Sequence, residues 1–222
     1  MSVLESLVLG LEKLVDVDAH EGPVYSEDER ALYFTTLAKP GFDVSIARLD
    51  LETLDVSVVR ESANGANGMT LAHDGRLLVC EQGTPRERAR ISAVDPVTGA
   101  AETVVDELAG LRLNSPNDIV AAADGSTWFT DPSYGFLQGF TPAPAHGDYV
   151  YRYDGRRLAV VEDSFDKPNG LAFSPDGSTI AITTRLPCSR AAAAAAARTA
   201  SAPASSMILR VRKFCMLRLL SR

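Results

Sequence analysis

Cysteine, histidine and tryptophan are scarce in this chain: its 222 residues include three Cys, three His and one Trp. Only Cys80 lies before residue 185, so the main part of the chain has neither a disulfide framework nor a cysteine zinc site. There is also no signal peptide at Met1 and no apolar run long enough to span a membrane. We therefore expect a soluble cytoplasmic protein that does not associate with membranes.

Basic residues are few over the first 184 positions. This part holds 14 Lys and Arg against 29 Asp and Glu, a formal net charge of −15, and shows no basic stripe. Proteins that bind nucleic acids need Lys and Arg to meet the phosphates. The sequence thus excludes a nucleic-acid partner and favours a small molecule or a protein.

Acidic residues are missing altogether from positions 185–222, which carry eight Lys and Arg and a seven-alanine run at Ala191–Ala197. We therefore divide the chain into a folded part, 1–184, and an Ala/Arg-rich tail, 185–222. The tail is interpreted as a frameshift product or as a disordered extension. The alternative is a short amphipathic segment on a membrane surface, with Met207, Ile208 and Val211 on its apolar face.

A phrase repeated four times dominates the folded part. It is headed in turn by Glu21, Asn67, Asn117 and Asn169, at spacings of 46, 50 and 52 residues. Each copy holds two β-rich runs around an acidic turn, and in the last three copies this turn is Asp-Gly, which is typical of a hairpin. Repeats of this length with four strands each predict a β-propeller, whose first strands line a central channel. The four head residues would then face one another.

Each head residue also has a simpler interpretation. Asn67 and Asn169 precede glycine, where asparagine commonly serves a turn by tolerating left-handed backbone angles. Asn117 precedes Asp118 instead, so a side chain facing the channel is favoured there. Asp118 itself either orients that asparagine or is a solvated loop acid. Glu21, taken alone, is an ordinary exposed acid before a strand.

Five motifs in register with the repeat carry a family resemblance: EGPVY, RLNSPNDIV, WFTDPSYG, YVYRYDG and KPNGLAFSPDGSTIAIT. In this order they resemble the SMP-30/gluconolactonase/LRE-like family. The resemblance implies an all-β, six-bladed propeller that holds one divalent cation and hydrolyses small lactones, sugar lactones such as gluconolactone in particular. By this order of motifs the chain covers about three and a half blades.

The resemblance also implies site residues. Glu21, Asn117 and Asn169 occupy the positions that surround the metal in the family, and oxygen ligands of this kind suit calcium best, with zinc, magnesium or manganese as alternatives. Apart from the resemblance, Arg112 and Asn114 lie just before Asn117 in a loop that would open on the channel mouth. Asn117, Arg112 and Asn114 are therefore expected to bind substrate, the arginine through a sugar-acid oxygen. A solvated surface role is the competing interpretation of Arg112.

One expected residue has no counterpart. The family aspartate that serves as ligand and base would lie beyond Thr184, where this sequence has the alanine tract. We therefore assign no catalytic base and expect weak or absent lactonase activity for the chain as written. The alternatives are a non-enzymatic interaction propeller or an inactive fragment, and unpaired blade edges could promote self-association.

Overall fold

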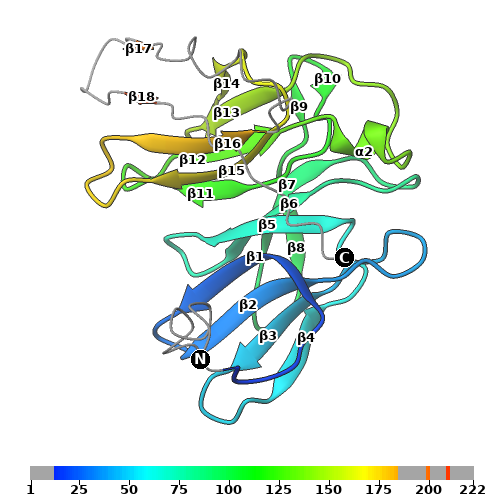
Figure 1. Cartoon of the computed structure of the whole chain (residues 1–222), viewed down its shortest axis with the longest axis vertical. Coiled ribbons are helices and arrows are strands. Elements are labelled where there is room, and N and C mark those ends of the chain that lie inside the picture. The colour runs from blue at the N-terminus through cyan, green and yellow to red at the C-terminus, as the bar shows by residue number, and fades with distance from the viewer. Residues whose placement is uncertain (1–12, 185–198, 201–208, 211–222) are drawn as a thin grey trace, which may run out of the picture.

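A computed structural model describes residues 13–184, 199–200 and 209–210. Four of its antiparallel sheets are blades, which follow one another in chain order: three have four strands and the last has two, and consecutive strands of a blade are neighbours (Figure 1). Blade 1 contains β1 (Ala19–Ser26), β2 (Ala31–Thr36), β3 (Ile46–Asp50) and β4 (Val56–Arg60). Blade 2 contains β5 (Ala66–Leu71), β6 (Leu77–Glu81), β7 (Arg90–Val94) and β8 (Ala101–Val105).

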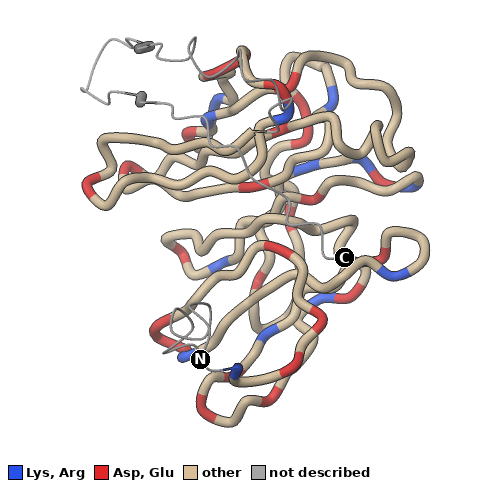
Figure 2. Tube along the Cα trace, in the orientation of Figure 1, with Lys and Arg blue, Asp and Glu red and all other residues tan. Residues whose placement is uncertain are grey.

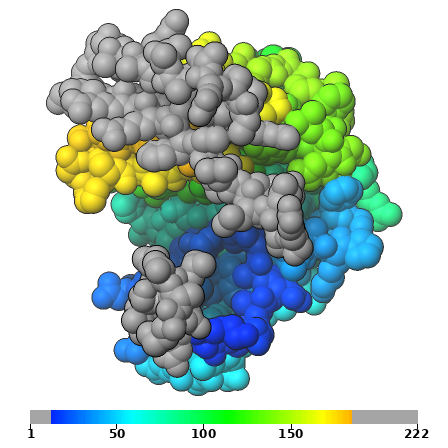
Figure 3. All heavy atoms as spheres, in the orientation of Figure 1, coloured from blue at the N-terminus to red at the C-terminus, as the bar shows by residue number. Residues whose placement is uncertain are grey.

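The third blade follows a long connection that carries the short pair β9 (Glu107–Leu108) and β10 (Leu111–Arg112). Blade 3 contains β11 (Ile119–Ala121), β12 (Thr127–Asp131), β13 (Tyr149–Tyr153) and β14 (Leu158–Glu162), with the one-turn helix α2 (Tyr134–Leu137) between β12 and β13. Blade 4 consists of β15 (Pro168–Phe173) and β16 (Ile180–Thr184). The all-β prediction of three and a half blades is confirmed. The space-filling view places blade 1, in blue, at the opposite end of the molecule from blade 4, in yellow (Figure 3).

Little of the region 185–222 falls within the described residues. The described part of this region consists of β17 (Thr199–Ala200) and β18 (Leu209–Arg210), which pair with each other. The frameshift, disorder and membrane-surface interpretations of this region otherwise concern positions outside the described residues. The boundary at residue 184 stays a prediction. No described helix has the length and apolar character needed to cross a membrane.

The acidic turns of the repeat close the first hairpin of blades 2, 3 and 4. Asp74, Asp124 and Asp176 each accept a backbone N–H from the residue two positions later, at 2.9 to 3.1 Å. The glycine after each aspartate has a left-handed φ, between +67° and +84°, a conformation that glycine adopts without steric cost. The prediction that these aspartates serve the turns is confirmed.

The hydrophobic core lies between neighbouring blades, because each sheet buries its faces against the next sheet. One cluster joins blades 1 and 2 around Tyr33 and Leu77. A second joins blades 2 and 3 around Phe129, which is fully buried, and a third joins blades 3 and 4 around Trp128 and Ile182. Leu and Phe side chains of this kind stabilise by about 1.5 to 3 kcal/mol each when buried. Blade-to-blade packing therefore fixes the relative positions of the inner strands.

Candidate functional site

The inner strands of the blades carry the four head residues. Glu21 lies in β1, Asn67 in β5 and Asn169 in β15, while Asn117 comes two residues before β11. The pairing of β1, β5 and β15 with the next strand is irregular across Glu21/Val24, Ala66/Met69 and Pro168/Leu171. Such bulges turn side chains away from the regular pleat and are common near active sites.

Threonine hydroxyls on the second strands join successive inner strands. Thr35 Oγ1 donates to the carbonyl oxygens of Glu21 at 3.0 Å and Asn67 at 3.3 Å. Thr130 Oγ1 donates to the carbonyl of Asn169 at 2.6 Å and accepts the N–H of Asp118 at 3.1 Å. These contacts link blade 1 to blade 2 and blade 3 to blade 4.

Blades 2 and 3 are joined by a direct backbone contact. Gly68 N–H donates to the carbonyl of Asn117 at 2.8 Å. A Cβ atom on Gly68 would lie 2.6 Å from that same oxygen and 2.5 Å from Asp118 Oδ1, closer than real Cβ atoms approach. Glycine is therefore required here by the approach of the neighbouring strand. The head residues of consecutive blades are thus brought together, as the repeat predicts.

The turn interpretation of Asn67 and Asn169 is wrong. Both residues lie inside strands, and neither has a left-handed φ. The glycines that follow them, Gly68 and Gly170, face the adjacent strand: Asp118 oxygens come within 2.5 Å and 3.5 Å of the positions that their Cβ atoms would take. The Asn-Gly pairs therefore mark the close packing of inner strands.

The amide side chains of the head residues are left without partners. Asn67 and Asn117 are 7% and 6% exposed, and Asn169 is half-buried. Within the described part of the chain, none of these three amides makes a side-chain hydrogen bond. None of their amide atoms is among the fully buried, unpaired polar atoms of the described residues, so these amides remain accessible. They are therefore available to a ligand.

Two carboxylates accompany these amides. Glu21 is exposed, and Asp118 is half-buried. Asp118 accepts the N–H of Ile119 at 2.9 Å and, across the blade boundary, the N–H of Leu171 at 3.0 Å. Burial raises the pKa of Asp118 above its ordinary value, and the charge of Glu21 adds to that rise, while the two N–H bonds lower it. The influence of Glu21 on Asp118 connects blade 1 with blade 3 electrostatically. Asp118 itself holds blade 4 against blade 3.

The donor set suits a hard divalent cation. Carboxylate and amide oxygens are the ligands that Ca²⁺ and Mg²⁺ prefer, and the site offers Glu21 together with the unpaired amides of Asn117 and Asn169. Over residues 13–184 and the two short strands beyond, no three His, Cys, Asp or Glu side chains gather into a cluster. A cation here would therefore depend on asparagine oxygens as well as on carboxylate.

The other two predicted substrate residues lie in the loop before Asn117. Arg112 is partly exposed and its guanidinium donates to the carbonyl of Ala143. Asn114 is 6% exposed; its Nδ2 donates to the carbonyls of Gly147 at 3.0 Å and Asp131 at 3.3 Å. Both residues line a groove of about 440 Å³. Asn114 therefore shapes the loop, and Arg112 is the more accessible of the two.

Two buried carboxylates that support these loops were not assigned to the site from the sequence. Asp131, with 0% exposure, accepts the N–H of Asn114 at 2.9 Å and of Ser115 at 2.8 Å. Glu81, equally buried, accepts the Nδ2 of Asn64 at 3.0 Å. Each acid is the last residue of the second strand of its blade: Glu81 follows LLVC and Asp131 follows WFT. This recurrence of an acid at the same position in two blades is the sequence pattern that could have identified them.

These carboxylates have different basic residues beside them. Arg90 Nε lies 2.6 Å from Glu81 Oε2, whereas His146 Nε2 lies 3.8 Å from Asp131 Oδ2. Burial raises the pKa of Asp131 to about 7, against the lowering effect of its two backbone N–H bonds. The entry loop of blade 3, which carries Asn117, is thus attached to a carboxyl that titrates near neutral pH.

Comparison with known proteins agrees with this architecture. Residues 19–189 match the SMP-30/Gluconolactonase/LRE-like region. A gluconolactonase from Zymomonas mobilis is 35% identical over 182 residues, which cover 76% of this chain and 49% of that protein. A lactonohydrolase from Aspergillus oryzae is 30% identical over 176 residues, which cover 74% of this chain and 40% of that protein.

A solved structure shows the same arrangement. The structure of a gluconolactonase from Xanthomonas campestris matches with a TM-score of 0.64 at 37% identity, over 76% of this chain and 56% of that one. The present chain thus spans about half the length of the curated relatives that it matches. The match over residues 19–189 covers most of the chain, which therefore belongs to the SMP-30/gluconolactonase/LRE-like family.

Proposed function

We propose that the described blades form part of a metal-dependent lactonase site. The observation that carries this proposal is the linkage of successive inner strands, which carry Glu21, Asn117 and Asn169, together with the unpaired amides of the two asparagines. The similarity to a gluconolactonase and a lactonohydrolase supports a lactone as substrate. A sugar lactone such as gluconolactone is the substrate we favour.

The cation would be held by Glu21, Asn117 and Asn169, with calcium the first choice because all three offer oxygen. Zinc, magnesium or manganese are the alternatives. When bound, such an ion supplies Lewis acidity to the lactone carbonyl. The roles of the chain itself are to hold these donors in place through Thr35 and Thr130, and to present Arg112 beside them.

In the reaction, the oxygen of water bonds to the lactone carbonyl carbon, the ring C–O bond breaks, and the ring oxygen receives a proton to give a hydroxy acid. The buried entry loop excludes water from one side of the site, because Leu113 and Ser115 are fully enclosed. Arg112 would orient the substrate by hydrogen bonding to one of its oxygens. We assign no described residue as the general base that removes the proton from water.

Metal binding can be tested apart from turnover. Isothermal titration of the purified chain with CaCl₂ should give one site, and Glu21→Gln and Asn169→Ala should each weaken it about tenfold or more, as expected when a ligand is lost. Glu61→Gln is the matched control, because Glu61 is exposed and its side chain has no partner among the described residues. Equal calcium binding by all four proteins would overturn the proposed ligand set.

Hydrolysis is the second readout. With Ca²⁺ present, the chain is assayed on glucono-1,5-lactone by titration of the acid released, and Asn117→Ala should lower the rate above the spontaneous background. A propeller that serves only as an interaction module needs no carboxylate at its axis. Calcium binding without any turnover would therefore retain the metal site and refute the lactonase activity of this chain.

A further inference from the structure

A groove lies at the end of the blades that carries the head residues. Three loops build it: 82–89 between β6 and β7, 106–118 before β11, and 132–148 between β12 and β13. Because successive strands of each blade are antiparallel, these connections all lie at the end where the inner strands begin. Arg112 is five residues before Asn117 in one of these loops. The groove thus opens at the same end of the blades as the proposed site.

The groove is positively charged within a strongly acidic protein. Its lining includes Arg86, Arg88 and Arg112 but only one acid, Glu87, although acidic residues outnumber basic ones along most of the trace (Figure 2). Glu87 has its own cation, since its Oε2 lies 3.8 Å from Arg90 Nη2. The positive charge of the groove is therefore not neutralised from within.

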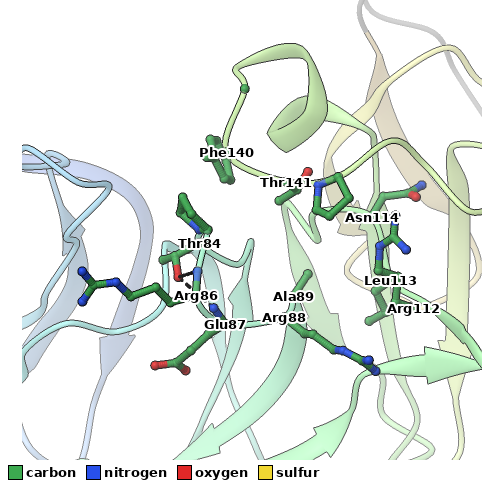
Figure 4. Close-up of a pocket in the computed structure, with 13 residues that line it drawn as sticks. Thr84, Arg86, Glu87, Arg88, Ala89, Arg112, Leu113, Asn114, Phe140 and Thr141 are labelled. Carbon is green, nitrogen blue, oxygen red and sulfur yellow. Dashed lines mark hydrogen bonds between the residues drawn. The ribbon is translucent and has the colours of Figure 1, made fainter.

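The arginines differ in what they contact. Arg86 and Arg88 extend in opposite directions from their loop (Figure 4). In the described structure neither side chain forms a hydrogen bond or an ion pair, and Arg112 donates only to the carbonyl of Ala143. Arg88 comes from blade 2 and is exposed, and Arg112 comes from the loop entering blade 3. Two arginines from different parts of the fold thus line one groove, and both have guanidinium donors without a partner among the described residues.

The remaining lining suits a small polar ligand. The groove volume of about 440 Å³ lies within the range of about 300 to 1,000 Å³ that is common for small-molecule sites. The lining includes the largely buried side chains of Leu113 and Phe140 and the hydroxyl-bearing residues Thr84 and Thr141 (Figure 4). Buried anchors fix its walls, because Asp131 holds Asn114 and Leu113 is 1% exposed.

We infer that this groove binds an oxyanion substituent of the substrate, a phosphate or a carboxylate, through Arg88 and Arg112. This inference rests on the proposed function and narrows it: the preferred substrate is an acidic sugar lactone. Guanidinium groups bind both anions by paired N–H donors. The lactone ring would then lie toward Asn117, with its charged end in the groove.

The test measures binding of stable hydroxy-acid products, so that it does not depend on turnover. Isothermal titration compares 6-phosphogluconate, glucarate and gluconate, which share a carbon chain and differ in the group at the sixth carbon. We expect 6-phosphogluconate or glucarate to bind about tenfold more tightly than gluconate. The stronger of the two identifies the anion as phosphate or carboxylate.

Variants assign the preference to the groove. Arg88→Ala and Arg112→Ala should each remove most of the tenfold preference. Arg156→Ala is the matched control: Arg156 is an exposed arginine in the turn between β13 and β14, at the other end of the blade. The preference should also weaken between low and high salt, because exposed charges are screened. Circular dichroism checks that each variant is folded.

The outcomes separate the two proposals. Equal binding of the three acids, or an equal loss of preference in Arg156→Ala, overturns the groove inference. An Arg88-dependent preference in a chain that hydrolyses no lactone leaves the groove in place and refutes the proposed activity. Turnover of glucono-1,5-lactone without any preference among the acids would retain the proposed activity and refute the groove inference.

Discussion

Gly68 is a point of close approach between blades 2 and 3, and its replacement by alanine tests the packing of their inner strands. The added Cβ would lie 2.5 Å from Asp118 Oδ1 and 2.6 Å from both the Asn117 carbonyl oxygen and the Asp118 Cα. Two of these three atoms belong to backbone, so rotation of a side chain cannot relieve the overlap. The inner strands of the two blades have to separate.

The cost follows from this overlap. Overpacking of a tight contact commonly costs about 1 to 3 kcal/mol, and we expect Gly68→Ala to reach the upper end, about 3 kcal/mol, since backbone must move. For a chain of this size, that corresponds to a fall in Tm of about 6 to 12 °C. Separation of the strands also displaces Asn117, so calcium affinity should fall with stability.

Gly170→Ala is the matched control. Gly170 also follows a head asparagine and has no left-handed φ, but its Cβ would lie 3.2 Å from Thr183 Oγ1 and 3.5 Å from Asp118 Oδ2, both side-chain atoms. We expect its stability to remain within about 1 kcal/mol of the unmodified chain, because alanine lowers the entropy of the unfolded state. Urea denaturation followed by tryptophan fluorescence measures both variants. Equal stability of Gly68→Ala and Gly170→Ala would refute the close approach of blades 2 and 3.

Three further substitutions test the supports of the site. Burial raises the pKa of Asp131 from 3.8 to about 7. This carboxyl therefore favours the folded state fully below pH 3.8 and loses that contribution as the pH rises through 7. Asp131→Asn should make the free energy of unfolding less dependent on pH over this window, as measured by urea titration at several pH values. Glu81→Gln removes the carboxylate 2.6 Å from Arg90 and leaves this arginine only Glu87, at 3.8 Å. The change should cost about 3 kcal/mol in the same assay, and a loss below about 1 kcal/mol would contradict the ion pair. Thr130→Val removes the hydroxyl that binds the Asn169 carbonyl at 2.6 Å. The change should cost about 1 to 2 kcal/mol of stability and weaken calcium binding. Unchanged calcium affinity would show that Thr130 does not support the metal site.

The repeat made most of the architecture predictable. Turn chemistry is local, so Asp74, Asp124 and Asp176 could be placed at hairpins from the adjacent glycines alone. The spacing of the head residues likewise predicts that Asn117 and Asn169 come together, because equivalent positions of successive blades are neighbours at the axis.

The remaining features depend on contacts between blades, which a single sequence does not display. The sequence Asn67-Gly68 fits equally well a glycine needed for a turn and a glycine needed for the close approach of another strand. Only the position of Asp118 in the neighbouring blade distinguishes the two roles. The support that Asp131 gives to Asn114 joins residues 17 positions apart through a buried loop. The groove needs three loops from two blades, so Arg88 could not be distinguished from any other exposed arginine.

The threonine contacts at the axis also set an order of assembly. Thr35 joins blade 1 to the head of blade 2, and Thr130 joins blade 3 to the head of blade 4. Each link needs only the blade that follows it along the chain. During synthesis, which proceeds from the N-terminus, the first link can form before the later repeats have left the ribosome. The polar axis would then grow by one head residue at a time, with each completed blade serving as the template for the next.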